Sequence, residues 1–177
     1  TQGNWNGIVG RMELRSSPPI WINALRVYAA NDGTVRAEID VRNTLFDPVG
    51  GTISVTVRER ASGRAVGAGQ TTFSYPRGLT TDHRHIWTTF ATAKVALKLE
   101  SPPKLWDEFS PALYTAEARL ETNDSTHSHA ARTTFGFREL KTQGTQFVLN
   151  ARKAFFRGTL ECCIFPRTGH PPVDVEE

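Results

Sequence analysis

The residues best suited to chemistry are two adjacent cysteines, Cys162 and Cys163, in the stretch RGTLECCIFP at residues 157–166. They are the only cysteines of the chain, so they cannot form a disulfide framework. They are also poorly placed to bond to each other, because Cα atoms about 3.8 Å apart are closer than a relaxed disulfide allows. Zinc ligands are commonly about two to four residues apart and need partners, whereas His127 and His129 lie far upstream. We therefore predict no metal site, and favour packing over a reactive thiol for both cysteines.

Paired carboxylates are the second group with catalytic potential, since one can act as an acid while the other acts as a base or nucleophile. Glu38 with Asp40 and Glu117 with Glu121 lie on the polar side of alternating stretches, where a charge normally serves solvation. The remaining acidic cluster closes the sequence: Asp174, Glu176 and Glu177. No pair has a context for acid–base work, so we predict no catalytic residue in this chain.

The charge of the chain argues against nucleic acid as a partner. The formal net charge is only +3, and the arginines are scattered without a basic run that interleaves with aromatic residues. Nucleic-acid binding needs a concentrated basic surface. No stretch is apolar for long enough to span a bilayer, and none resembles a signal peptide. Because the sequence begins without Met, it is compatible with a signal peptide removed upstream.

The elements that would position these residues follow a period of two. Val35, Ala37, Ile39 and Val41 alternate with charged residues, and similar alternation recurs at residues 53–58, 91–99 and 114–121. This is typical of half-buried strands. Turn signals separate the runs: Asn31-Asp32-Gly33, Asp47-Pro48-Val49-Gly50-Gly51, Ser62-Gly63 and Asn123-Asp124-Ser125. With no convincing amphipathic helix, we predict an all-β fold: an immunoglobulin-like β-sandwich of two antiparallel sheets over residues 20–137, with the four apolar residues inward.

The two ends differ from this central part. Residues 1–19 contain a Gly/Trp segment and a short strand, closed by Ser16-Ser17-Pro18-Pro19, which is typical of a linker after another domain. After Gly136 we predict a hairpin formed by residues 140–142 and 146–149, with Asn150 serving a turn, and then an apolar strand at residues 154–160.

Three motifs follow one another along the chain. The first is Gly7-Ile8-Val9-Gly10-Arg11-Met12-Glu13-Leu14. The second is Leu105-Trp106-Asp107 with Pro111, Leu113 and Tyr114. The third joins Phe135-Gly136-Phe137-Arg138-Glu139, Phe147 with Leu149-Asn150, and Phe156-Arg157-Gly158. In order and spacing they resemble glycoside hydrolase family 2, which includes β-galactosidases, β-glucuronidases and β-mannosidases. The resemblance covers nearly the whole chain, although the aromatic residues can also be explained as core or strand-edge anchors.

The resemblance implies a fragment of a larger enzyme. Residues 1–19 would be the tail of a sugar-binding jelly roll with its linker, residues 20–137 the immunoglobulin-like domain, and residues 138–177 the hairpin and first strand of a truncated catalytic (β/α)8 barrel. The parent would be a retaining, β-galactosidase-like glycosidase whose carboxylate pair lies beyond residue 177, so this fragment is expected to be inactive. The resemblance implies no cofactor. The expected partners are the jelly roll, the barrel and the parent's carbohydrate substrate, with neither nucleic acid nor a membrane span. A periplasmic or secreted location is favoured.

The cysteines acquire a second interpretation from the family pattern. After Arg-Gly, family members commonly continue x-Asn-x-His toward the sugar, and this chain has Leu160 and Cys162 at those positions. Glu161, Cys162 and Cys163 are therefore candidates for lining the barrel mouth of the parent, beside the alternative that they pack within the barrel.

Two other functions stay open at this point. The first is a stand-alone carbohydrate-binding sandwich that uses exposed aromatic residues, and the second is an extracellular adhesion-type domain. The candidate platforms for the first are Trp5, Trp21, Trp87 and Trp106. A sugar-binding face needs exposed coplanar rings, whereas a spacer domain buries them, so solvent exposure discriminates between the two.

Overall fold

The computed structural model of the chain describes residues 12–45, 47–75, 91–160, 167 and 169. The chain divides into two compact units. One unit comprises Ser17–Ala154 and holds every strand of the described residues. The other comprises Thr1–Ser16 and Phe155–Glu177.

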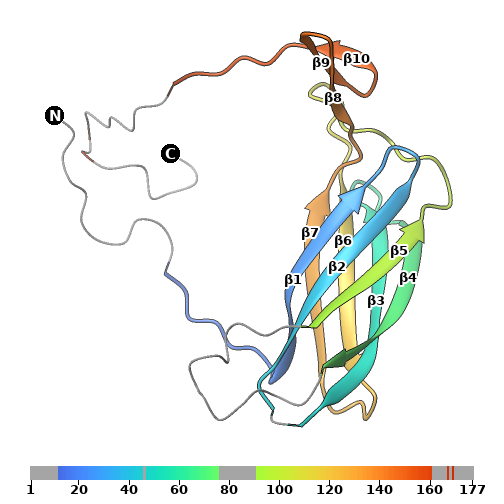
Figure 1. Cartoon of the computed structure of the whole chain (residues 1–177), viewed down its shortest axis with the longest axis vertical. Coiled ribbons are helices and arrows are strands. Elements are labelled where there is room, and N and C mark those ends of the chain that lie inside the picture. The colour runs from blue at the N-terminus through green and yellow to red at the C-terminus, as the bar shows by residue number, and fades with distance from the viewer. Residues whose placement is uncertain (1–11, 46, 76–90, 161–166, 168, 170–177) are drawn as a thin grey trace. The chain divides into compact units, whose positions relative to one another are not determined.

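Seven strands of the larger unit form the predicted sandwich, which Figure 1 shows as two sheets laid face to face. The three-stranded sheet has the order β1-β2-β5, and the four-stranded sheet has the order β4-β3-β6-β7. All pairings within them are antiparallel. The strand bounds are β1 Ile20–Ala29, β2 Thr34–Asn43, β3 Val49–Glu59, β4 Ala65–Tyr75, β5 Ala91–Lys98, β6 Tyr114–Thr122 and β7 Ser128–Phe135.

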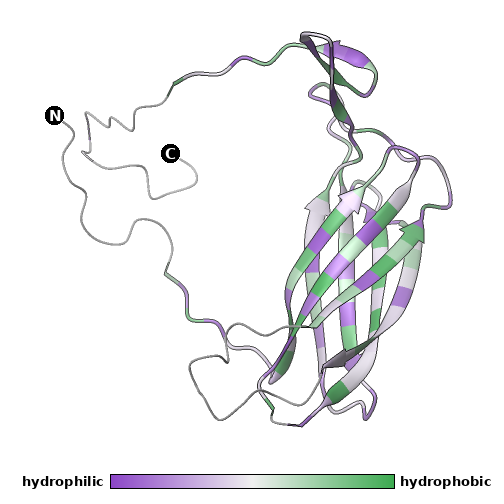
Figure 2. Ribbon diagram, in the orientation of Figure 1, coloured by the Kyte–Doolittle hydropathy of each residue, from purple (hydrophilic) through white to green (hydrophobic). Residues whose placement is uncertain are grey.

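The core lies between these sheets and confirms the predicted register. Val35, Ala37, Ile39 and Val41 have no exposed surface. They pack with inward residues of the other sheet, such as Val55 of β3. Figure 2 shows hydrophobic and hydrophilic residues interspersed along the strands of the sandwich. Because a slip of one residue would turn every apolar side chain outward, the buried face fixes how the strands pair.

The two sheets also touch along both long sides of the sandwich. On one side β4 lies against β5, where a Cβ added to Gly69 would be 2.9 Å from Val95 Cγ1. The missing side chain therefore lets the two edge strands approach closely. On the other side β1 lies against β7, and the Ile22 amide donates a hydrogen bond of 3.1 Å to His129 Nδ1.

A small third sheet, with the order β10-β9-β8, follows the sandwich in the sequence (Figure 1). Its strands are β8 Leu140–Gln143, β9 Gln146–Leu149 and β10 Arg152–Ala154, so the predicted hairpin is confirmed. Asn150 and Ala151 connect β9 to β10 with φ of 49° and 64°. Positive φ at both residues of a two-residue turn is the left-handed geometry that matches the twist of paired strands.

The apolar strand predicted at residues 154–160 is wrong beyond its first residue. Strand β10 ends at Ala154, and Phe155 and Leu160 are 84% and 91% exposed. A strand needs a neighbour that satisfies its backbone groups, and no described strand pairs with residues 155–160. The described residues contain no helix, and hence none long and apolar enough to cross a membrane.

Candidate functional site

Many of the residues singled out from the sequence for chemistry lie outside the described residues. This holds for the barrel-mouth candidates Glu161, Cys162 and Cys163, for Trp5 and Trp87, and for Asp174, Glu176 and Glu177. Among the described residues, no group of three or more His, Cys, Asp or Glu side chains is arranged to hold a metal ion. The site has therefore to be sought among the carboxylates and aromatic residues of the larger unit.

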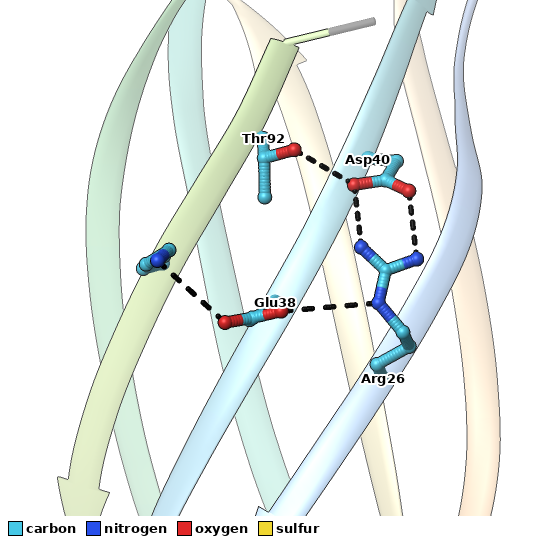
Figure 3. A network of polar contacts seen from close by, with 5 residues as sticks. Arg26, Glu38, Asp40 and Thr92 are labelled. Carbon is cyan, nitrogen blue, oxygen red and sulfur yellow. Dashed lines mark hydrogen bonds and ion pairs between the residues drawn. The ribbon is translucent and has the colours of Figure 1, made fainter.

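Asp40 does not behave as the sequence predicted. It lies on the outer face of its sheet but is only 4% exposed, because Arg26 of the adjacent strand lies over it. Figure 3 shows the bidentate pair, in which Nη1 and Nη2 of Arg26 donate to the two carboxylate oxygens at 2.8 Å each. Thr92 Oγ1 donates to Oδ1 at 2.9 Å, and Glu38 lies 3.9 Å from Arg26 Nε. The prediction of a merely solvated charge is therefore wrong for Asp40.

The electrostatics of this network do not suit acid catalysis. The hydrogen bonds from Arg26 are the main cause that lowers the pKa of Asp40, against the opposing effect of burial. On β6, burial raises the pKa of Glu117, but hydrogen bonds from Arg132 and Arg119 outweigh it and the net shift is downward. A general acid needs a raised pKa to hold its proton near neutral pH. Both carboxylates are instead held ionised by arginines.

Hydrogen bonds and ring contacts connect the small sheet to the end of the sandwich. We call this place the junction and define it as residues 104–114, 135–139 and 149–152. Leu105 and Phe137 form a parallel bridge, and the Trp106 amide donates to the Phe137 carbonyl at 2.8 Å. The Trp106 side chain packs on Gly136, where an added Cβ would be 2.9 Å from Trp106 Cβ. The guanidinium of Arg138 lies 5.0 Å from the centre of a Trp106 ring. These contacts tie the segment after β5 to the segment after β7.

Asn150 joins the small sheet to the same place. Its Nδ2 donates to the Trp106 carbonyl at 2.9 Å, and its Oδ1 accepts the Glu139 amide at 2.9 Å. Its own amide donates to the Glu139 carbonyl at 2.9 Å. Oδ1 also accepts from Nδ2 of Asn31, in the β1–β2 turn, at 3.1 Å. The predicted role in a turn is thus only part of what Asn150 does, because its side chain connects three separate segments.

Aromatic rings pack against one another at the inner side of the junction. Phe137 has no exposed surface, and its ring meets that of Tyr114 edge-on at 4.9 Å between centroids. Phe135 lies 5.4 Å from Phe137. The Tyr114 hydroxyl accepts the Lys104 amide at 2.9 Å, which satisfies its polar end. Such geometries are favourable for aromatic pairs and add to the area they bury.

A salt bridge closes the outer side of the junction. Arg152 of β10 donates to Glu108 Oε1 at 2.9 Å, and its guanidinium lies 5.1 Å from the centre of the Phe109 ring. All three residues are largely exposed, so this pair adds little stability compared with the buried contacts.

The two described tryptophans do not form an exposed platform. Trp21 and Trp106 are both half-buried, and Trp106 is engaged by Gly136 and Arg138. Within the described residues, the exposure of tryptophan therefore favours a spacer over a sandwich that stacks sugars on flat aromatic rings.

The comparisons with known proteins agree with this arrangement. The profile described as "Glycosyl hydrolases family 2" matches residues 20–138. The chain belongs to this family. Similar solved structures include a family 2 member from Bacteroides cellulosilyticus, with 15% identity and a TM-score of 0.58 over 76% of this chain and 18% of that chain. β-Glucuronidases from Bacteroides uniformis (17% identity, TM-score 0.57, 76% of this chain, 16% of that chain) and Parabacteroides merdae (19% identity, TM-score 0.57, 80% of this chain, 16% of that chain) are also similar.

At these identities the solved structures show a shared fold, and this chain spans less than a fifth of their lengths. None of the curated proteins matched the chain. In this family 2 chain, two of the three motifs that carried the resemblance, around Leu105–Tyr114 and Phe135–Asn150, meet at the junction. The contacts that sequence reasoning missed are those of Asn31, Arg138 and Arg152, which join residues too far apart for any periodic pattern to pair.

Proposed function

We propose that this chain is the immunoglobulin-like domain of a family 2 glycoside hydrolase, and that it holds neighbouring domains in register without itself catalysing hydrolysis. The observation that carries the proposal is the junction, where Trp106, Phe137 and Asn150 bond the small sheet to the end of the sandwich. A spacer between two domains has to fix the direction in which the chain enters and leaves it. A network of hydrogen bonds that joins separate segments is well suited to this role.

The proposed organisation follows the family resemblance. Residues 1–19 are the end of a jelly roll with its linker, and residues 20–137 are the spacer. Residues 138–177 are the hairpin and the segment that becomes the first strand of the catalytic barrel in the parent, where neighbouring strands are available. The parent degrades carbohydrate in the periplasm or outside the cell. Glu161, Cys162 and Cys163 lie near the barrel mouth of that parent.

The proposed chemistry of the parent is retaining, β-galactosidase-like hydrolysis of O-glycosidic bonds. It requires two carboxyl groups about 5–5.5 Å apart, one as nucleophile and one as acid and base, and needs no cofactor. The pairing of Asp40 and Glu117 with arginines supports the view that this chain does not supply them.

The lack of catalysis is tested with the purified chain and nitrophenyl β-galactoside, β-glucuronide and β-mannoside. We expect no release of nitrophenol above the buffer rate. Asp40→Asn and Glu117→Gln are the matched controls, with circular dichroism to confirm that both fold. A contaminating enzyme would give the same rate in all three samples. Turnover that is lost in a folded variant would assign catalysis to this chain and contradict the proposal.

The spacer role is tested in the parent enzyme by Asn150→Ala, with Lys153→Ala on exposed β10 as the control. Loosening the junction should widen the distribution of domain positions measured by small-angle X-ray scattering and lower kcat/KM, because the domains no longer keep one geometry. If scattering and activity of the Asn150 variant both equal those of the control, the junction does not set domain positions.

A further inference from the structure

A hollow of about 650 Å³ lies on the outer face of the four-stranded sheet, and its described lining residues do not belong to the junction. Its volume is within the range of roughly 300–1,000 Å³ common for small-molecule sites. It is lined by Pro18, Thr52, Ser54, Arg119, Leu120, Glu121, Ser128, His129 and Ala130.

The pairing of the strands explains why the surface is hollowed there. Thr52, Glu121 and Ser128 are register partners across β3, β6 and β7, and they form one row. Ser54, Arg119 and Ala130 form the next row on the same face. Each row thus places one long charged side chain on the central strand between two short ones. Neighbouring strands are only about 4.8 Å apart, so the short residues leave space beside the long ones.

The charges in the hollow are balanced. Arg119 and Glu121 carry opposite charges two residues apart on β6, and three hydroxyl side chains surround them. His129 is only partly exposed, and burial lowers its pKa, so it adds no charge near neutral pH. An anion would meet Glu121 and a cation would meet Arg119, so neither is favoured over a neutral ligand rich in hydroxyl groups.

Both charged side chains have bonding capacity left. The Nε of Arg119 pairs with Glu117, which leaves further N–H groups of the guanidinium. Glu121 Oε1 accepts a hydrogen bond from Ser125 Oγ at 3.0 Å, and a carboxylate accepts about four in total. A charged donor and a charged acceptor side by side match two adjacent hydroxyls of a sugar ring, because the donor can bond one oxygen while the acceptor takes the proton of the next.

We propose that this hollow binds one neutral saccharide unit, with Arg119 donating to one hydroxyl and Glu121 accepting from its neighbour. The ring of Pro18 supplies an apolar wall at the edge. None of the described residues that line the hollow is Trp, Tyr or Phe, so the affinity is weak, with a Kd of about 1 mM or above. This goes beyond the spacer role and does not depend on it, since it rests on residues outside the junction.

The test is a titration of the ¹⁵N-labelled chain followed by two-dimensional NMR. The probes are methyl β-D-galactopyranoside, methyl β-D-glucopyranoside and methyl β-D-mannopyranoside, with methyl β-D-glucuronide as the anionic probe and glycerol as the generic polyol. We expect saturable shifts, for at least one neutral glycoside, at the amides of the two rows: Thr52, Ser54, Arg119, Glu121, Ser128 and Ala130.

Matched variants connect the shifts to the proposed contacts. Arg119→Ala and Glu121→Gln should each weaken binding by about tenfold, the loss expected for a hydrogen bond to a charged group. Glu117 keeps its bond to Arg132 in the first variant, and a dispersed spectrum confirms that each variant folds. Arg58→Ala, on β3 but outside the hollow, should bind like the unchanged chain.

Three outcomes would overturn the inference. The first is the absence of saturable shifts with any neutral glycoside, and the second is shifts that glycerol reproduces or that survive both variants at full affinity. The third is tighter binding of the glucuronide, which would make the hollow an anion site. None of these outcomes bears on the absence of hydrolysis or on the junction, which have their own tests.

Discussion

Asn150 illustrates at the scale of one residue how this chain fixes its geometry. Its amide nitrogen bonds the Trp106 carbonyl and its amide oxygen bonds the Glu139 amide. Its backbone has a φ of 49°, a conformation that asparagine tolerates better than most residues. One side chain therefore satisfies both a demanding turn and two backbone groups of separate segments. The turn and the junction cannot be changed independently of each other.

We predict opposite effects for substitutions at the two residues of this turn. Asn150→Ala removes the three hydrogen bonds of this side chain and should lower the free energy of unfolding by about 2–3 kcal/mol. Ala151→Gly relieves a side chain at a φ of 64° and should raise it by about 1 kcal/mol. Urea denaturation of the three proteins, followed by circular dichroism, measures both changes. A stabilising Asn150→Ala would show that the side chain adds nothing to the junction.

The limits of sequence reasoning are clearest at single residues. The alternation around Asp40 correctly placed it on the outer face of β2, but its burial depends on Arg26 of another strand. The sequence predicted that Asn150 serves a turn. It did not predict the hydrogen bond from Asn150 to Trp106, which lies 44 positions away. A periodic pattern reports which face a residue occupies. It carries no information on which distant side chain will cover that residue.

At the scale of elements, the contact between β1 and β7 contains a group that titrates. The Ile22 amide needs an unprotonated Nδ1 on His129, and burial lowers the pKa of this imidazole from its ordinary value of 6.5. The folded state thus favours the neutral imidazole. At lower pH the unfolded chain binds the proton more readily than the folded chain does, which favours unfolding. The contribution of the neutral imidazole to stability is therefore complete above pH 6.5 and is lost as the pH falls through the lower folded-state pKa.

We therefore predict that His129→Asn removes this pH dependence. The Oδ1 of asparagine can take the place of Nδ1 as the acceptor for Ile22, and it does not titrate near pH 6. As the pH falls from 7.5 to 5.5, the unfolding free energy of the unchanged chain should decrease relative to that of the variant. This window is set by the ordinary histidine pKa of about 6.5. Parallel stability curves for the two proteins over this window would refute the prediction.

The close contact of Trp106 with Gly136 gives a prediction for the attachment of the small sheet. Gly136→Ala would place Cβ 2.9 Å from Trp106 Cβ, so one segment has to move, at about 1–3 kcal/mol. Gly158→Ala, where an added Cβ meets nothing within 4 Å, is the control. Hydrogen exchange should accelerate in β8–β10 of the Gly136 variant more than in β2 or β3. Equal protection of the small sheet in both variants would contradict this.

The elements themselves were largely predictable, for a physical reason. Strands β2, β3, β5 and β6 each bury one face, so their alternation is visible in the sequence, and the hairpin of β8 and β9 has its turn signal between them. The strand expected at residues 154–160 has the same apolar composition but no partner among the described strands. Composition predicts that a segment can pair, whereas a strand forms only where a neighbour is available.

At the scale of the whole molecule, the larger unit should fold without the residues assigned to the other one. The buried apolar residues that the structure describes, from Ile20 to Leu149, all belong to the larger unit, so a chain limited to that unit keeps this core. We predict that a chain of residues 17–154 keeps its unfolding free energy within about 0.5 kcal/mol. Urea denaturation of both lengths, followed by circular dichroism, measures this. A markedly less stable short chain would assign a structural role to the removed residues.

The contacts along both sides of the sandwich have a consequence for how copies of the protein behave in a crowded solution. A free strand edge is a template for aggregation. Here β1 lies against β7 and β4 against β5, so each edge of the two large sheets is occupied by the opposite sheet. The small sheet keeps two edges, and these carry Lys141 on β8 and Arg152 and Lys153 on β10. Charged side chains on an edge oppose the addition of a strand from another copy, so the described strands resist assembly into larger sheets.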